Sequence, residues 1–143
     1  MNATQLLKDY IETHFSESRV IVLGDLNDSL TDRAEDNVFT SMLNDVDHYL
    51  FADMSIAEGD STQWSFPSYP SHLDHIVLSN ELFDAFEHED SSVWPIPVDD
   101  VFFDGWWDYE RTVSDHRPVA LRLPLSEQTG EETAWAPSLG LAW

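Results

Sequence analysis

One short apolar run constrains the fold of this chain most. Residues 20–23 read VIVL, and three of these four side chains are β-branched. A continuous run of this kind is typical of a strand that is buried on both faces. It ends abruptly at Gly24 and Asp25, and an amphipathic helix predicted over residues 4–15 precedes it. A helix that leads into a buried strand with polar residues at its end indicates an α/β protein with a site there.

The other apolar patterns predict a small number of further elements. They indicate helices over residues 34–43 and 81–86, strands over 63–66, 72–79 and 119–123, and a loop over 90–108. We therefore predict an α/β fold with one mixed or antiparallel sheet and flanking helices. A single domain is expected over residues 1–125, followed by an acidic, weakly ordered tail over residues 126–143.

The charge and the residue types exclude several classes of function. The formal net charge is −22, because 28 acidic residues stand against 6 basic ones, and a surface this acidic repels nucleic acid. It fits a solvated surface adapted to high salt, and equally a group of carboxylates that attracts divalent cations. The absence of cysteine excludes disulfides, thiolate metal sites and cysteine nucleophiles. We expect no transmembrane segment and no signal peptide, and the compartment stays open.

Three short polar clusters each flank a predicted strand: GDLN at residues 24–27, LDHI at 73–76 and SDHRP at 114–118. Asp and His are costly beside buried strands unless they are paired or bind a metal. Taken alone, Asp25 reads as a turn residue and His116 as a hydrogen-bonded surface histidine. Three such clusters in one small domain predict that they converge on a single site.

In this order, the clusters resemble the endonuclease/exonuclease/phosphatase (DNase I-like) superfamily. The matching segments are VIVLGDLN, then QWSF with SHLDHIVLS, then SDHRPV, and the resemblance covers residues 6–124. It implies a fold that is half of a four-layer α/β/β/α sandwich. It also implies metal-dependent hydrolysis of phosphoester bonds, with a nucleic acid, a nucleotide or a phospholipid head group as substrate.

The resemblance also implies a role for each site residue. Asp25 would orient and help deprotonate the attacking water, and Asn27 would bind a phosphate oxygen. Asp115 would be the metal-side carboxylate, with Mg²⁺ or Mn²⁺ as the ion. His116 would contact the scissile phosphate, and Asp74 would accept a hydrogen bond from its other ring nitrogen and so fix its tautomer. We expect Asp74 and His116 to lie within hydrogen-bond distance.

Members of this superfamily have a further N-terminal half, which supplies an Asn and the principal metal-binding Glu. Because the predicted helix and strand begin almost at Met1, we expect the site to need such a half, or self-association, for completion. The competing interpretation is a non-catalytic fragment or interaction module that keeps the sheet without a full metal site. Of the remaining histidines, His75 is open between a structural and a substrate-facing role, and His72 is expected in a loop.

Overall fold

The computed structural model describes residues 3–125, and the acidic segment predicted as a tail lies outside these described residues. In chain order the elements are α1 (Ala3–His14), β1 (Ile21–Asp25), α2 (Thr40–Leu43), β2 (Tyr49–Phe51), α3 (Met54–Ala57), η1 (Ser61–Gln63), β3 (Asp74–Ser79), η2 (Asn80–Leu82), α4 (Phe83–Phe86), β4 (Ser92–Pro95), η3 (Val98–Val101), α5 (Trp106–Thr112) and β5 (Val119–Arg122), where η marks a 3₁₀ helix. The chain thus mixes helices with strands, as the predicted α/β class requires.

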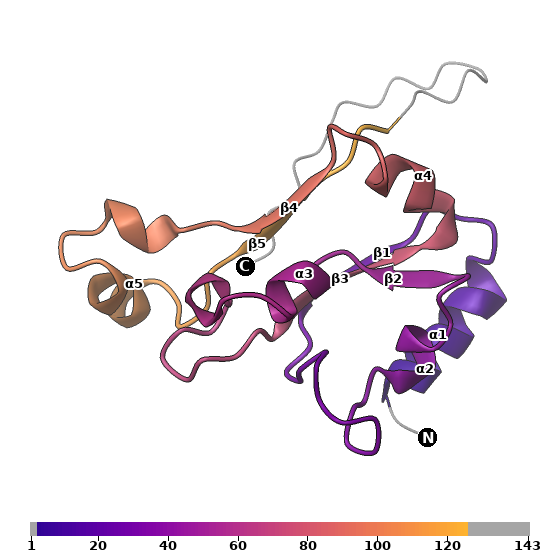
Figure 1. Cartoon of the computed structure of the whole chain (residues 1–143), viewed down its shortest axis with the longest axis horizontal. Helices are drawn as coiled ribbons and strands as arrows, with labels where there is room; N and C mark the ends of the chain where they lie inside the picture. Colours follow the sequence, from indigo (N-terminus) through magenta and orange to yellow (C-terminus); the bar gives the residue numbers. More distant parts are fainter. Residues whose placement is uncertain (1–2, 126–143) are drawn as a thin grey trace.

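The strands form two antiparallel sheets where the sequence predicted one (Figure 1). Three strands lie in the order β1-β3-β2, with β3 in the centre. β4 and β5 pair with each other as a separate ribbon that extends away from this sheet. In the register of β1 with β3, Asp25 stands opposite Asp74 and Gly24 stands opposite His75.

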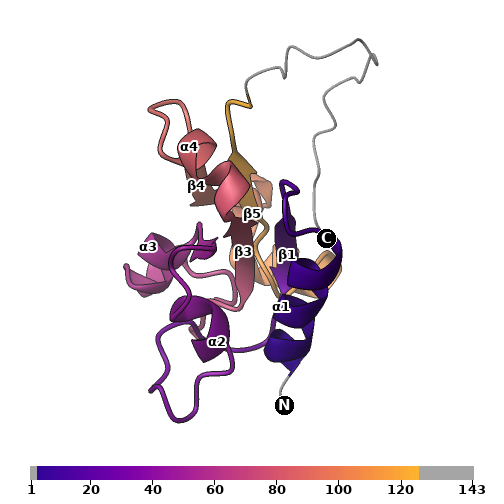
Figure 2. The same cartoon turned by 90° about the vertical axis from the view of Figure 1, so that its right-hand side faces the viewer.

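The core lies on both faces of the three-stranded sheet. Successive residues of β3 alternate between the faces. Val77 packs in a cluster with α1 and α2, whereas Ile76 and Leu78 pack in a second cluster with α4 and the β4–β5 ribbon. Figures 1 and 2 show α1 and α2 gathered on one side of β1 and β3, and α4 beside the ribbon on the other. A strand covered on both faces explains why the centre of β3, Ile76 to Leu78, is wholly apolar.

Some predicted elements differ from those observed, and for one of them local hydrogen bonds give the reason. The helix predicted over residues 34–43 is reduced to α2, because the amide of Asn37 binds the carbonyl of Leu30 and its oxygen accepts from the amide of Phe39. The strand predicted over 63–66 does not form: η1 ends at Gln63, and Phe66 makes only a single bridge with Ser71. The loop predicted over 90–108 contains β4, η3 and the start of α5.

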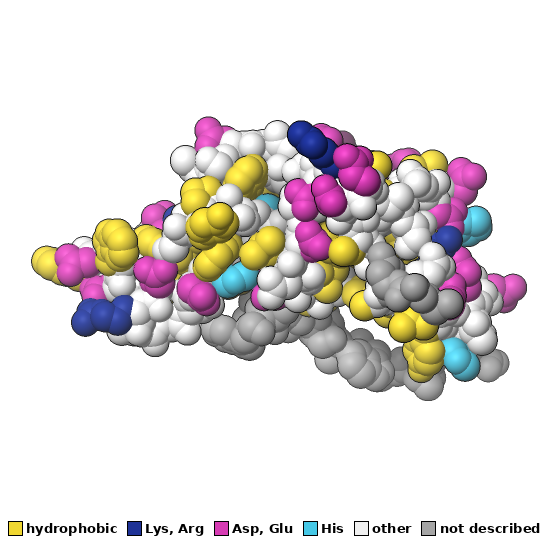
Figure 3. Space-filling view, turned by 90° about the horizontal axis from the view of Figure 1, so that it is seen from below, with side chains coloured by type: hydrophobic (Ala, Val, Ile, Leu, Met, Phe, Trp, Pro, Cys, Tyr) yellow, Lys and Arg dark blue, Asp and Glu magenta, His cyan; other side chains and the backbone are white. Residues whose placement is uncertain are grey.

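The surface is strongly acidic, as the composition predicted. On the face drawn in Figure 3, Asp and Glu side chains are spread along the molecule and Lys and Arg are few. Among the residues that the structure describes, no helix has the length and apolar character to cross a membrane.

Candidate active site

All five side chains singled out in the sequence line one open pocket of about 530 Å³. The three polar clusters that supply them lie far apart in the chain and meet at the end of the three-stranded sheet where β1 ends and β3 begins. The pocket is lined in part by Asp25, Asn27, Asp74, Asp115 and His116. The predicted convergence of the clusters is therefore confirmed as a matter of geometry.

The end of β1 is shaped by two residues with positive φ. Gly24 has φ +146°, a conformation that residues with a side chain rarely adopt. Asn27 has φ +58°, in the left-handed region that Asn tolerates. Between them, a carboxylate oxygen of Asp25 accepts from the backbone N–H of Asn27 at 2.9 Å, which closes a tight turn. This turn leaves both Asp25 and Asn27 at the pocket wall.

The expected hydrogen bond between Asp74 and His116 is confirmed. Nδ1 of His116 lies 2.6 Å from Oδ2 of Asp74, and the two side chains are 19% and 20% exposed. The ring of Phe66 stacks on His116 with centroids 4.8 Å apart. Because Nδ1 faces Asp74, Nε2 is the ring nitrogen left for a ligand in the pocket.

Ser65, from the QWSF segment, joins the clusters that carry Asp74 and His116. Its buried hydroxyl accepts from the backbone N–H groups of Leu73 and Asp74 at 3.1 and 3.2 Å. Its carbonyl accepts from the backbone N–H of Arg117 at 2.7 Å. One serine therefore fixes the spacing between the start of β3 and the segment that precedes β5.

Arg117 anchors the neighbouring segment on the far side of His116. Its guanidinium donates two hydrogen bonds to the carboxylate of Asp99, at 2.8 and 2.7 Å, and lies 5.3 Å from the ring centroid of Trp106. The two hydrogen bonds from Arg117 hold the pKa of Asp99 below its ordinary value despite the burial of that carboxyl. Through these contacts with Asp99 in η3 and Trp106 in α5, Arg117 holds both elements beside the pocket.

The pocket carries an excess of negative charge. Asp25 and Asp74 occupy directly opposed positions of neighbouring strands, and Asp115 lines the same pocket. No Lys or Arg is among the described residues that line it. Like charges that face each other across strands repel, so the arrangement favours a bound cation.

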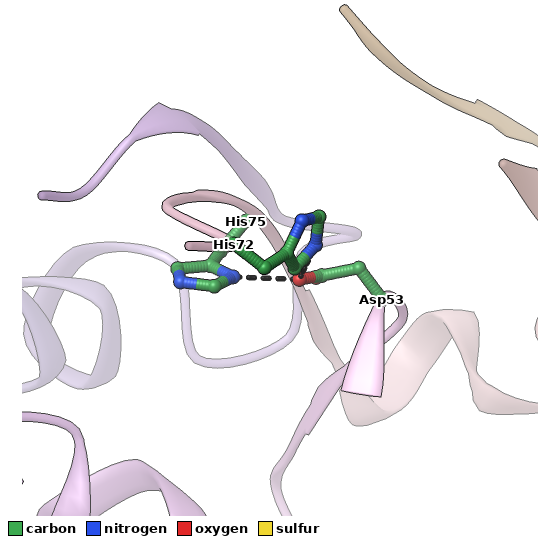
Figure 4. A group of neighbouring side chains, drawn as sticks. All are labelled: Asp53, His72 and His75. Atoms are coloured by element: carbon green, nitrogen blue, oxygen red, sulfur yellow. Dashed lines mark hydrogen bonds and ion pairs between the residues drawn. The ribbon is translucent and has the colours of Figure 1, made fainter. Parts of the chain in front are cut away.

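Asp53, His72 and His75 form a second titratable group, in which both histidine rings point toward the Asp53 carboxylate (Figure 4). Oδ2 of Asp53 lies 2.6 Å from Nδ1 of His75 and 3.0 Å from Nε2 of His72. All three residues are buried, and their potential ligand atoms lie within 4.8 Å of one another, so the group could hold a metal ion. His72 lies between elements, as predicted. His75 also borders the pocket, but its side chain is fully buried and its ring packs against Phe39 and Phe51 in the core.

Asp53 was missed in the sequence, although one signal points to it. It follows directly after the apolar run over residues 49–52, a place where an unpaired carboxylate would be costly. Burial by itself would raise the pKa of Asp53, but hydrogen bonds from His72 and His75 outweigh it and lower that pKa to about 2. The carboxylate is therefore held ionised by its partners.

Comparisons with known proteins give no family or function for this chain. No family model matches it, and no curated protein or solved structure matches it either.

Proposed function

We propose that this chain is a metal-dependent phosphoesterase half-domain of the endonuclease/exonuclease/phosphatase type, acting through the pocket at the ends of β1 and β3. In this proposal, its three-stranded sheet and its β4–β5 ribbon make up half of a four-layer α/β/β/α sandwich. The observation that carries the proposal is the 2.6 Å pair of Asp74 and His116 in a pocket shared with Asp25, Asn27 and Asp115.

Each side chain has a role that its chemistry supports. Asp25 orients a water molecule and takes up its proton, which general-base catalysis requires. Asn27 donates its side-chain amide to a phosphate oxygen. His116 presents Nε2 to the scissile phosphate, where a protonated ring stabilises the charge that develops on the phosphate and leaving oxygens. Asp74 holds the ring of His116 in that orientation through Nδ1.

The donor set fits a hard divalent cation. The pocket offers carboxylate oxygens from Asp25, Asp74 and Asp115, and these are the ligands that Mg²⁺ and Mn²⁺ prefer. Asp115 would hold the ion, in agreement with the role that the resemblance implies. When bound, the ion would neutralise charge on the substrate's phosphoryl group.

The negative charge of the protein limits the kinds of phosphoester that it can bind. With a formal net charge of −22, the surface offers little Lys or Arg for tracking a long nucleic acid. The substrate is therefore a phosphoester that arrives with divalent counterions, such as a nucleotide, a phospholipid head group or a nucleic acid at high salt.

A second candidate function rests on the exposed edge of the three-stranded sheet. β1 is one of the two outer strands, and Ile21 and Leu23, on the same face of it as Asp25, are 42% and 46% exposed. An exposed sheet edge with apolar side chains is suited to pairing with another polypeptide. In this candidate, the chain binds a partner that carries the complementary half of the sandwich, or a second copy of itself, and the composite site is active.

Hydrolysis of bis(p-nitrophenyl) phosphate with Mg²⁺ or Mn²⁺ tests the leading proposal. We expect metal-dependent turnover by the unaltered chain and a loss of at least about 100-fold in kcat in His116→Ala. His48→Ala is the matched control, because His48 is an exposed histidine paired with Asp45 at 2.7 Å and does not line the pocket. This control should keep full activity.

The same samples separate the two candidates. Mn²⁺ binding without turnover, weakened in Asp115→Asn, would favour the composite site. A folded chain with neither turnover nor Mn²⁺ binding at this pocket would contradict both.

A further inference from the structure

We propose that Asp53 and His75 form a buried hydrogen-bonded clamp that fixes the turn after β1 and thereby positions Asn27 in the pocket. The two side chains of the clamp are fully buried, and the His75 ring packs in the core on the face of β3 opposite Asp74. Its effect on catalysis rests on the proposed function, whereas its effect on the turn does not.

The ring of His75 bridges two acceptors. Nδ1 lies 2.6 Å from the carboxylate of Asp53, and Nε2 lies 2.9 Å from the backbone carbonyl of Asp28. A carbonyl and an ionised carboxylate only accept hydrogen bonds, so both ring nitrogens must act as N–H donors. The side chain therefore links β2, where Asp53 follows the strand, to the turn that follows β1.

The hydrogen-bond roles around His72 distinguish this clamp from a metal centre. Nδ1 of His72 accepts from the backbone N–H of Ser65 at 3.3 Å, so its hydrogen is on Nε2, which donates to Asp53. A metal ion would need a lone pair on the nitrogens of His72 and His75 that here carry hydrogens. The other oxygen of Asp53 accepts from the backbone N–H of Ile76 at 2.8 Å. The three donors around Asp53 thus satisfy its carboxylate without an ion.

The core allows the His75 ring one orientation. The rings of Phe39 and Phe51 pack against it edge to face, with centroids 5.4 and 6.2 Å away, and the His75 side chain is fully buried. Both aromatic side chains belong to the cluster beneath the sheet. The direction of the Nε2–H group toward Asp28 is therefore set by packing.

The clamp acts on the part of the pocket that has no regular secondary structure. Besides the hydrogen bond from Asn27 N–H to Asp25 within the turn, two contacts tie the turn after β1 to the neighbouring strand. The N–H of Leu26 donates to the carbonyl of Leu73 at 2.9 Å, and the carbonyl of Asp28 accepts from His75. Asn27 lies between these two anchors with φ +58°. Loss of either anchor lets Asn27 leave the less populated left-handed conformation, and the residue then moves out of the pocket.

Two substitutions of His75 test the clamp, because each keeps one of its two contacts. The amide nitrogen of Asn corresponds in reach to Nδ1, so His75→Asn keeps the contact with Asp53 and loses the contact with Asp28. The amide nitrogen of Gln corresponds to Nε2, so His75→Gln keeps the contact with Asp28. We would measure hydrogen exchange at the amides of Leu26 and Asn27, with Val22 and Val77 in the paired strands as internal references.

In His75→Asn we expect exchange at Leu26 and Asn27 to become about tenfold faster or more relative to the reference amides, as the loss of one hydrogen bond to the turn implies. In His75→Gln the same ratio should stay near that of the unaltered chain. Equal acceleration in both variants, or equal acceleration at the reference amides, would show that His75 is only a packing residue. A metal ion that co-purifies in stoichiometric amount and is lost in both variants would also overturn the clamp.

Activity provides a separate readout. If the chain hydrolyses a phosphodiester, His75→Asn should lower kcat with little change in KM, and His75→Gln should restore much of it. The exchange measurement needs no turnover, so an inactive chain would contradict the proposed function and leave the clamp testable. Equal kcat values for the two variants, measured on an active chain, would mean that the turn does not position a catalytic group.

Discussion

Two Asp–His pairs on opposite faces of β3 share one short contact and differ in their surroundings. Asp74 meets His116 at 2.6 Å in the open pocket, and His75, the next residue of the strand, meets Asp53 at the same distance in the core. The first pair is about one-fifth exposed and the second is fully buried. The geometry of the contact alone therefore does not distinguish a site of chemistry from a structural group.

The difference lies in the atoms that each pair leaves unused. His116 uses Nδ1 for its partner and keeps Nε2 for a ligand in the pocket. His75 uses both ring nitrogens within the protein, and Asp53 receives donors on both oxygens. A pair that retains an unused donor or acceptor beside solvent can act on a substrate, whereas a saturated, buried pair rigidifies the fold.

The largest expected effect weakens the open pair. Asp74→Asn replaces the carboxylate that faces Nδ1 of His116 by a neutral amide, whose NH₂ group can turn toward Nδ1 and favour the other tautomer. We therefore expect kcat for a phosphodiester to fall by about 10²- to 10⁴-fold. Because the pair is partly exposed, the free energy of unfolding should change by no more than about 1 kcal/mol. Asp45→Asn, which breaks the exposed pair with His48, is the control for activity. An unchanged kcat in Asp74→Asn would remove the functional distinction between the two pairs.

Breaking the buried pair should mainly lower the stability of the fold, whereas breaking the open pair should mainly lower kcat. Asp53→Asn leaves buried histidine donors without their carboxylate, so we expect the free energy of unfolding at neutral pH to fall by about 3–5 kcal/mol. The folded pKa of Asp53, about 2, lies below the ordinary value of 3.8. Its stabilising contribution is therefore complete above about pH 4 and is lost as the pH falls through about 2.

Urea unfolding of both proteins between pH 7 and pH 2 measures this contribution. The difference between the unaltered chain and Asp53→Asn should shrink by about 2 kcal/mol toward the acid end. A difference that is constant across this range would mean that Asp53 is not held ionised by its histidine partners.

The smallest expected effect concerns the repulsion within the pocket. Asp25→Asn removes one of two opposed carboxylates but keeps an oxygen for the backbone N–H of Asn27. In a chelator, we expect the variant to be more stable by about 0.2–1 kcal/mol. Thermal unfolding with and without Mg²⁺ should then show a smaller stabilisation by the ion than in the unaltered chain. A variant that is less stable in the chelator would indicate that the opposed carboxylates do not repel each other appreciably.

Much of the framework could be predicted from local sequence. The amphipathic pattern of residues 4–15 and the apolar runs before Asp25 and after Asp74 gave α1, β1 and β3 close to their bounds. Elsewhere, side chains competed with regular structure, and the hydrogen bonds of Asn37 left only the last part of the helix predicted over residues 34–43, as α2. Such contacts join residues several positions apart in a turn, and periodicity alone does not reveal them.

The sequence by itself determined which residues could carry chemistry, because Asp, Asn and His at strand ends are costly without a partner or a ligand. Only the tertiary structure decided which of these residues line the pocket and which lie in the core. The antiparallel register put Asp25 opposite Asp74, and the alternation of β3 sent Asp74 to the pocket and His75 to the core. The hydrogen bonds of Asp53 are made with His72 and His75, which are 19 and 22 residues away in the sequence. Burial, register and unused hydrogen-bonding atoms are properties of the folded molecule, so no local pattern could assign them.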